Sequence, residues 1–311
     1  MATSGSVNYN ETANSIVKAA LSKLTVVGEN REPTPAQYTT GREELNRMIK
    51  HWMNIPINLW IKTEAVLIPT PATASYTLNS TGANWTVKSD FGKTEIGAAE
   101  ASGQTTITVD STTGMAASDV IIIEQDDDTV KATTISSVTD STTVVIAASL
   151  SAASAVDSNV YFFTTKYNKP LDVLHARLNN GEDSFTVLQP LSREQYFALP
   201  NRLTAGSPTH YYFDRQLSNG VLYLYPVPND PHKWVELTVA RYVEDFDTAS
   251  DDPDFPQEWL DALVWNLAKQ LAPNYGKAEY AALAINQIAD LKLIEVSSYD
   301  VESTSVFFQP E

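Results

Sequence analysis

The chain has 311 residues, a formal net charge of −17 and no cysteine. Its length allows one large core or two to three smaller ones, and the lack of cysteine excludes a disulfide framework and thiolate chemistry. The first twelve residues lack the basic start and apolar run of a signal peptide. No segment reaches the ~20 apolar residues needed to span a membrane, so we expect a protein that works without export signals.

The charge also limits how the protein meets nucleic acid. Lysine and arginine are scattered along the chain without a basic run, whereas a protein that grips DNA normally presents a basic face. Two interpretations stay open at this point. The protein never meets DNA, or it surrounds a duplex without holding it, because like charges repel.

Two helices are predicted at the N-terminus. The first covers residues 9–27, with Gly28 as a C-terminal cap. The second begins at a capping box in Thr34-Pro35-Ala36-Gln37 and ends before Pro56. Their predicted buried positions recur every three to four residues and are Ile16, Val17, Ala20, Leu21 and Leu24, then Tyr38, Leu45, Met48, Ile49 and Trp52.

The pattern changes to short strands after residue 62. Residues 63–68 and 75–78 alternate as strands do. Residues 91–165 differ in composition, because they are rich in threonine, serine, alanine, valine and isoleucine and hold no proline or tryptophan. Strands predicted there are 105–109, 120–124, 130–136, 142–146 and 160–164, with Asp126-Asp127-Asp128 at a turn. We interpret this segment as an inserted small all-β domain, a barrel or a sandwich.

Further strands follow the insertion, at 171–178, 184–188 and 234–243. Ser192 is predicted to cap a short helix. The strands 211–214 and 221–225 form a hairpin, for which Asn219-Gly220 is the preferred type I′ turn pair.

A capped helix and a second helix are predicted near the C-terminus. Pro256 lies in the first turn of the first helix, and Pro273 ends it before a turn at Gly276. The apolar stripe of this helix is Leu260, Leu263, Val264, Leu267 and Leu271. A second stripe, predicted to complete an antiparallel helical hairpin, is Tyr280, Leu283, Ala284, Gln287, Ile288, Leu291 and Ile294.

The acidic run between Glu244 and Asp261 is the main candidate for chemistry. It could supply paired carboxylates for glycoside hydrolysis or ligands for calcium, but it lacks the ligand spacing of an EF-hand. Negative charge is also expected in a solvated loop before a helix N-terminus. The histidines at positions 51, 175, 210 and 232 are isolated, and no nucleophile elbow, Walker loop or dinucleotide motif is present. We therefore predict no catalytic, cofactor-binding or metal-binding residues.

Two groups of aromatic residues allow more than one functional interpretation. The hairpin tyrosines Tyr211, Tyr212, Tyr223 and Tyr225 could stack on bases or sugars, or face a core or a subunit contact. The C-terminal stretch 298–311 loses helical periodicity and carries Phe307 and Phe308. It is either a frayed terminus or an arm that docks on a partner, because two exposed phenylalanines are costly in water.

Several motifs resemble one family, the head-to-tail adaptor proteins of short-tailed bacteriophages, also called connector, tail accessory or packaged-DNA-stabilising proteins. Near the N-terminus, Leu45-Asn46-Arg47-Met48-Ile49 is followed by Trp52. The segment from Ser192 through the hairpin to Pro226 is also similar to the family. At the C-terminus the signature residues are Phe255, Pro256, Trp259, Trp265, Pro273, Tyr275 and Gly276. The resemblance covers nearly everything outside the insertion and the extreme C-terminus.

The resulting expectation is an α+β fold without an active site. Helices in 1–62 and 251–297 form a four-helix bundle, residues 63–90 and 166–250 form a β layer, 91–165 are the inserted domain, and 298–311 are an extended arm. The resemblance implies a head-to-tail ring of twelve copies in the virion neck, assembled in the host bacterial cytoplasm, without membrane contact.

The implied partners are the portal protein, the tail nozzle or tube, a tail fibre or spike, and double-stranded DNA that passes without specific binding. Tyr299, Phe307 and Phe308 are the residues implied to dock on a partner. The alternatives are a phage-associated glycan hydrolase that uses carboxylates of residues 244–261, and a carbohydrate-binding tail protein that uses residues 91–165.

Overall fold

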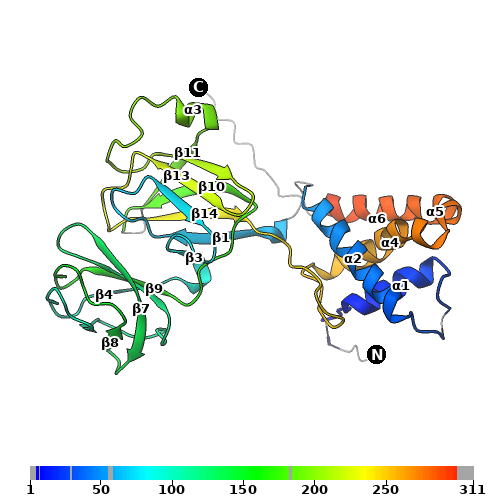
Figure 1. The fold of residues 1–311 in the computed structure, drawn as a ribbon, viewed down its shortest axis with the longest axis horizontal. Helices are drawn as coiled ribbons and strands as arrows, with labels where there is room; N and C mark the ends of the chain where they lie inside the picture. The colour runs from blue at the N-terminus through cyan, green and yellow to red at the C-terminus, as the bar shows by residue number, and fades with distance from the viewer. Residues whose placement is uncertain (1–4, 7, 29, 55–58, 182–183, 300–311) are drawn as a thin grey trace. The chain divides into compact units, whose positions relative to one another are not determined.

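The computed structural model describes residues 5–6, 8–28, 30–54, 59–181 and 184–299. Its fold is mixed α+β, as the sequence predicts, and the chain divides into two compact units (Figure 1). One unit combines residues 1–61 with 242–311, and the other is the continuous stretch 62–241. None of the helices in the described part of the chain is long and apolar enough to cross a membrane.

The first unit is helical and is organised around α4. This helix contacts α1, α2 and α6, and its predicted stripe from Leu260 to Leu271 is buried. The helices are α1 (Ala13–Lys23), α2 (Pro35–Trp52), α4 (Leu260–Leu271), α5 (Ala278–Ala284) and α6 (Asn286–Tyr299), with short 3₁₀ helices η1 (Leu59–Ile61), η3 (Gln257–Trp259) and η4 (Pro273–Tyr275).

The start of α2 confirms the predicted capping box. The Thr34 side chain accepts a hydrogen bond from the Gln37 backbone N–H (3.3 Å), and the Gln37 side chain accepts one from the Thr34 N–H (2.8 Å). Two backbone donors that the helix itself cannot satisfy are therefore paired. Pro35 occupies the first turn, where its missing N–H leaves no bond unmade.

The predicted cap of α1 at Gly28 is wrong, because the helix ends at Lys23. Thr25 adopts φ 56°, and Val26 N–H donates to the Leu21 carbonyl (3.1 Å) while Thr25 N–H donates to that of Ser22 (2.9 Å). This is the Schellman arrangement, which usually places glycine where Thr25 lies. A threonine in the left-handed region is uncommon, so the sequence pattern favours the next glycine, Gly28, as the cap.

The second unit contains an eight-stranded sheet in the order β2-β13-β12-β11-β10-β14-β1-β3. The named pairs are antiparallel except β11 with β12, which are parallel. The strands are β1 (Lys62–Leu67), β2 (Ser75–Leu78), β3 (Trp85–Val87), β10 (Asp172–Asn179), β11 (Phe185–Pro190), β12 (His210–Arg215), β13 (Gly220–Tyr225) and β14 (Trp234–Ala240). A short helix, α3 (Arg193–Phe197), follows β11 with Ser192 as its N-cap, as predicted.

The hairpin of β12 and β13 is confirmed, but its predicted two-residue turn is wrong. Arg215 pairs with Gly220, so four residues form the loop, and Gln216 N–H donates to the Asn219 carbonyl (3.0 Å). Gly220 lies within the strand, where a Cβ would stand 2.6 Å from the Phe213 ring. This glycine therefore makes room for an aromatic ring instead of supplying a positive φ.

A six-stranded sheet lies in the chain between β3 and β10, in the order β4-β9-β6-β7-β8-β5. An antiparallel bridge between Ile96 and Val109 joins the two outer strands just beyond their ends, so the sheet curls back on itself around its own apolar core. The strands are β4 (Gly92–Glu95), β5 (Thr106–Thr108), β6 (Val120–Glu124), β7 (Val130–Val138), β8 (Thr143–Ile146) and β9 (Asn159–Phe163). Residues 126–128 lie in the β6–β7 turn, as predicted.

The two sheets share apolar contacts. Ile122 on β6 and Tyr161 and Phe163 on β9 form one buried cluster with residues of the eight-stranded sheet, including Trp234. Ile121 and Ile123, the neighbours of Ile122, belong to the core of the six-stranded sheet instead. Strand β6 is thus buried on both faces, and the six-stranded sheet is packed against the larger one.

Candidate functional site

Four aromatic side chains gather where the two halves of the helical unit meet. They are Trp52 at the end of α2, Trp60 in η1, and Phe255 and Trp259 just before α4. Their ring centroids lie 4.8–6.4 Å apart in the five pairs they form, with the tilted and edge-on geometry that aromatic pairs prefer. Three predicted signature residues, Trp52, Phe255 and Trp259, are therefore parts of one apolar cluster.

The remaining signature residues lie along α4 and at its end. Lys23 Nζ lies 4.6 Å from the centre of the Trp265 ring, in a cation–π contact between α1 and α4. Pro273 starts η4, and Gly276 ends it with φ 65°, a conformation that suits glycine. Pro256 precedes η3, so the helix begins with a 3₁₀ turn. These positions shape α4 and the turn after it.

The second C-terminal stripe does not face the core, which corrects the prediction. The helix is divided into α5 and α6 at Ile285, although Ile285 N–H donates to the Ala281 carbonyl (2.9 Å) and Ala289 N–H to that of Ile285 (2.8 Å). The buried face is Ala281, Ile285 and Ala289. Their four-residue spacing places them on one face, and the two small alanines allow close helix packing; this is the signal that could have identified the buried face.

The large apolar side chains of the predicted stripe are exposed instead. We call this set the α5–α6 row, and its members are Tyr280 (42% exposed), Leu283 (85%), Ile288 (36%), Leu291 (58%) and Ile294 (63%). No charged residue belongs to the row, and the predicted members Ala284 and Gln287 lie on the same face and are exposed too. Exposed apolar side chains gathered on one helix face make this row a candidate contact surface.

Asn266 fixes the buried face of α6 against α4. Its side-chain Nδ2 donates to the Ala289 carbonyl on α6 (3.0 Å) and to the Ala262 carbonyl on its own helix (2.9 Å). Lys269 and Asp290 add an ion pair between the same two helices (2.6 Å). The orientation that leaves the row in solvent is thus held by polar contacts on the opposite face.

The predicted docking residues fall at the end of the chain. Tyr299 is the last residue of α6. Its side chain, and all of Phe307 and Phe308, lie outside the residues that the structure describes.

The acidic run is organised as a loop at the N-terminus of α1. Ala13 N–H donates to the Asp251 carbonyl (2.9 Å), so the loop satisfies a free donor of the helix. The Asp251 carboxylate accepts from the backbone N–H groups of Asp247 (2.7 Å) and Thr248 (2.6 Å), and from the Thr248 hydroxyl. These bonds, led by the one from the Thr248 hydroxyl, lower the pKa of Asp251.

Other contacts tie this loop to α2. Asn46 and Phe246 exchange two hydrogen bonds, of 3.0 and 2.9 Å, between the amide side chain and the backbone. Lys50 pairs with Asp245 (2.5 Å). Within the described ranges, no three histidine, aspartate or glutamate side chains come close enough together to hold a metal ion. Asp251 and Asp254 accept hydrogen bonds from the backbone of this loop, and Asp245 binds α2.

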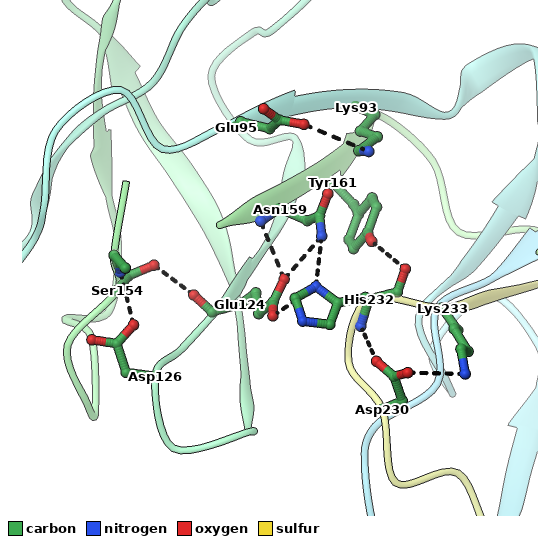
Figure 2. Close-up of polar contacts among 11 residues, drawn as sticks. Lys93, Glu95, Glu124, Asp126, Ser154, Asn159, Tyr161, Asp230, His232 and Lys233 are labelled. Atoms are coloured by element: carbon green, nitrogen blue, oxygen red, sulfur yellow. Dashed lines mark hydrogen bonds and ion pairs between the residues drawn. The ribbon is translucent and has the colours of Figure 1, made fainter. Parts of the chain in front are cut away.

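A polar cluster joins the two sheets of the β unit (Figure 2). Glu124 is buried on β6 and accepts from the backbone N–H (3.2 Å) and side-chain amide (3.0 Å) of Asn159 on β9. Its other oxygen lies 3.0 Å from Nδ1 of His232, in the loop before β14. Tyr161 O–H donates to the His232 carbonyl (3.3 Å), and burial, followed by the charge of Glu124, raises the pKa of Tyr161.

The same loop carries Asp230, which accepts from the His232 N–H (3.0 Å) and pairs with Lys233 (3.0 Å). Burial alone would raise the pKa of Asp230, but the hydrogen bonds from Lys233 and His232 outweigh it and the pKa lies below its ordinary value. Glu124 therefore links the two sheets, whereas Asp230 stabilises the loop that carries His232. His232 is isolated in the sequence, and the fold brings it next to Glu124.

Two of the hairpin tyrosines pack on each other. Tyr212 and Tyr223 stack at 5.6 Å with 16° between their planes, and Tyr196 of α3 covers both. Tyr211, Tyr212 and Tyr196 are buried. Tyr212, Tyr223 and Tyr196 occupy one another's ring faces, and Tyr211 belongs to the apolar core of the eight-stranded sheet. For these residues the arrangement favours a core over a platform for bases or sugars.

Comparison with protein families identifies a family for this chain. The family model of the SU10 adaptor proteins matches residues 116–305, from the turn before β6 through α6 and into the C-terminal stretch. No curated protein matches the chain.

Proposed function

The chain belongs to the SU10 adaptor protein family, and from that premise we propose that it is the head-to-tail adaptor of a bacteriophage virion. The family points to a structural role without catalysis, in association with other proteins of the phage capsid and tail. In our proposal, twelve copies form a closed ring under the portal. The ring extends the DNA channel and attaches the tail nozzle or tube, and a tail fibre or spike.

The family match over residues 116–305 is the observation that carries this proposal. It includes the hairpin and the C-terminal signature on which the resemblance to adaptor proteins rests. The exposed α5–α6 row supports the proposal, because a subunit of an assembly needs apolar surface to bury against its neighbours.

The proposed architecture assigns a part to each segment. The helices of both chain ends form a four-helix bundle core, the middle strands form a second layer, and residues 91–165 are an inserted domain. The C-terminal arm, with Tyr299, Phe307 and Phe308, docks on the portal. The net charge of −17 suits a channel through which a duplex slides without specific binding. Assembly takes place in the host bacterial cytoplasm.

Electron cryomicroscopy of the virion neck tests the proposal. The expected result is a twelve-fold ring of this chain between portal and tail, which native mass spectrometry of the chain mixed with purified portal should reproduce. The chain alone is the control for portal-dependent assembly. Density for the chain at any other site of the particle, such as a fibre tip, would overturn the proposal.

A further inference from the structure

The α5–α6 row is the largest apolar feature that the described residues leave uncovered on the helical unit. Its five side chains lie within residues 280–294, which at 1.5 Å per residue is about 21 Å of helix. The outer face of α2 differs, since Glu43, Arg47 and Lys50 are exposed there. The row is thus an uncharged ridge on a strongly acidic chain. Burying its apolar side chains against another surface would be favourable.

Helices α1 and α6 both pack on α4, from different sides (Figure 1). A groove lies along α1. It has a volume of about 670 Å³, and its lining includes Tyr9, Ser15, Lys18, Ala19 and Ser22. Four of these residues recur at three- to four-residue spacing on one face of α1, with Tyr9 beside them. Small side chains between larger ones leave the kind of space into which the ridge of another helix packs.

The helices that bear the ridge and the groove differ in charge, although in the groove lining itself Glu11 balances Lys18. α1 has Lys18 and Lys23 and no acidic residue, whereas α5 and α6 have Glu279, Asp290 and Glu295 against one lysine. The same asymmetry holds for the two segments of the unit. Residues 1–61 hold six Lys and Arg against five Asp and Glu, and residues 242–311 hold three against fourteen, so their net charges are +1 and −11.

We infer that the α5–α6 row of one copy packs into the α1 groove of the next copy, and that this contact builds the ring. The inference rests on the proposed function, because it names the surfaces that the ring would use. Two rows facing each other would bring together the acidic residues of both copies and would close as a dimer. Packing of the ridge into the groove joins two different surfaces. Such a heterologous contact continues from copy to copy until the ring closes.

Cysteine cross-linking tests this contact, because the chain has no cysteine of its own. The full-length double variant Ala19→Cys with Leu283→Cys is assembled on the purified portal protein and treated with a short bismaleimide. The expected product is a ladder of covalent oligomers. An equal mixture of the two single variants should stop at dimers, because each copy then carries one reactive surface.

Matched controls separate this contact from chance collisions. Arg47→Cys combined with Leu283→Cys places the second thiol on the exposed face of α2 (Arg47 side chain 62% exposed) and should give no ladder. Leu283→Cys alone should stay monomeric. Leu283→Asp should weaken ring formation at least tenfold while the far-ultraviolet circular dichroism stays unchanged.

Each other outcome has a definite meaning. Rings seen by electron microscopy without the ladder would overturn the inference and leave the proposed function standing. Dimers from Leu283→Cys alone, or its cross-linking to the portal protein, would show that a second row or the portal covers the ridge and would also overturn the inference. A chain that forms no ring with the portal would count against both.

Discussion

Glu236 shows how a single buried charge is kept ionised in the β unit. Its carboxylate pairs with Arg177 (2.7 Å) and Lys88 (3.2 Å), and both cations also reach Glu64. Burial alone would raise the pKa of Glu236, but the hydrogen bonds from Arg177 and Lys88 outweigh it, so the pKa is lower than the ordinary value of 4.5. The charged form is therefore favoured in the folded state.

We predict that Glu236→Gln lowers the free energy of unfolding by about 1–2 kcal/mol at pH 7. The value is below that of a fully buried pair, because Arg177 and Lys88 keep 39% and 44% of their side chains exposed. Since the folded pKa is lowered, the contribution is complete above pH 4.5 and is lost as pH falls through the folded pKa. Urea unfolding of both proteins at several pH values should show their difference shrinking in acid. Glu64→Gln, at an exposed site, should change stability by less than about 0.5 kcal/mol.

The sequence predicts the roles of some residues correctly and of others wrongly, and Thr34 and Gly220 show why. The sequence predicts the capping role of Thr34 correctly, because a capping box is a local interaction between residues three apart. The Asn-Gly pair predicts a turn at Gly220, whereas this glycine makes room for Phe213 on the paired strand. A sequence window contains the first interaction but not the second, which depends on strand pairing.

At the scale of one element, the cap of α2 gives a direct test. Thr34→Ala removes the side-chain acceptor of Gln37 N–H, and we expect a loss of about 1 kcal/mol in unfolding free energy. Thermal unfolding with Thr39→Ala as the control measures it, because Thr39 is exposed within the same helix. An equal loss in the control would mean that the cap contributes nothing.

The α5–α6 helices show what periodicity can and cannot predict. The stripe from Tyr280 to Ile294 correctly predicts helical structure, because three-to-four spacing is a property of the segment alone. Which face is buried depends on Asn266 and on the close approach of Ala289 to α4, and neither is visible in the spacing of large apolar residues. The sequence pattern therefore predicts that the α5–α6 row is buried, whereas in one copy of the protein the row is exposed.

A matched pair of substitutions tests that orientation. Ile285→Ala, on the buried face, should lower the unfolding free energy by about 2–4 kcal/mol through lost burial and the cavity left behind. Leu283→Ala, two residues away and 85% exposed, should change it by less than about 0.5 kcal/mol. Denaturant unfolding of the free chain decides, and a larger loss for Leu283 would mean that the row is buried within one copy.

For the molecule as a whole, the β unit is one uninterrupted segment with its own apolar cores. We predict that a fragment of residues 62–241 folds alone, since its sheets and shared cluster need no residue of the helical unit. A single cooperative thermal transition and dispersed amide signals in a nuclear magnetic resonance spectrum would support this. A fragment without cooperative unfolding would contradict it.

The composition of residues 91–165 predicted most strands of the smaller sheet close to their observed bounds, but not the packing of that sheet against the larger one. The predicted strands rest on local alternation, whereas the packing depends on β6 and β9, which are apolar on both faces. Such continuous runs are typical of strands covered on two sides. The runs Val120–Ile123 and Val160–Phe163 carried this signal in the sequence.

The pairing of Lys62 with Ala240 in neighbouring strands has a practical consequence. The peptide that leads into the β unit and the one that leads out of it start from adjacent positions, about 5 Å apart. A short glycine linker could therefore replace all 180 residues between them without stretching the chain. In phage lineages, the same geometry would let recombination exchange this unit for another while the helical unit keeps its sequence.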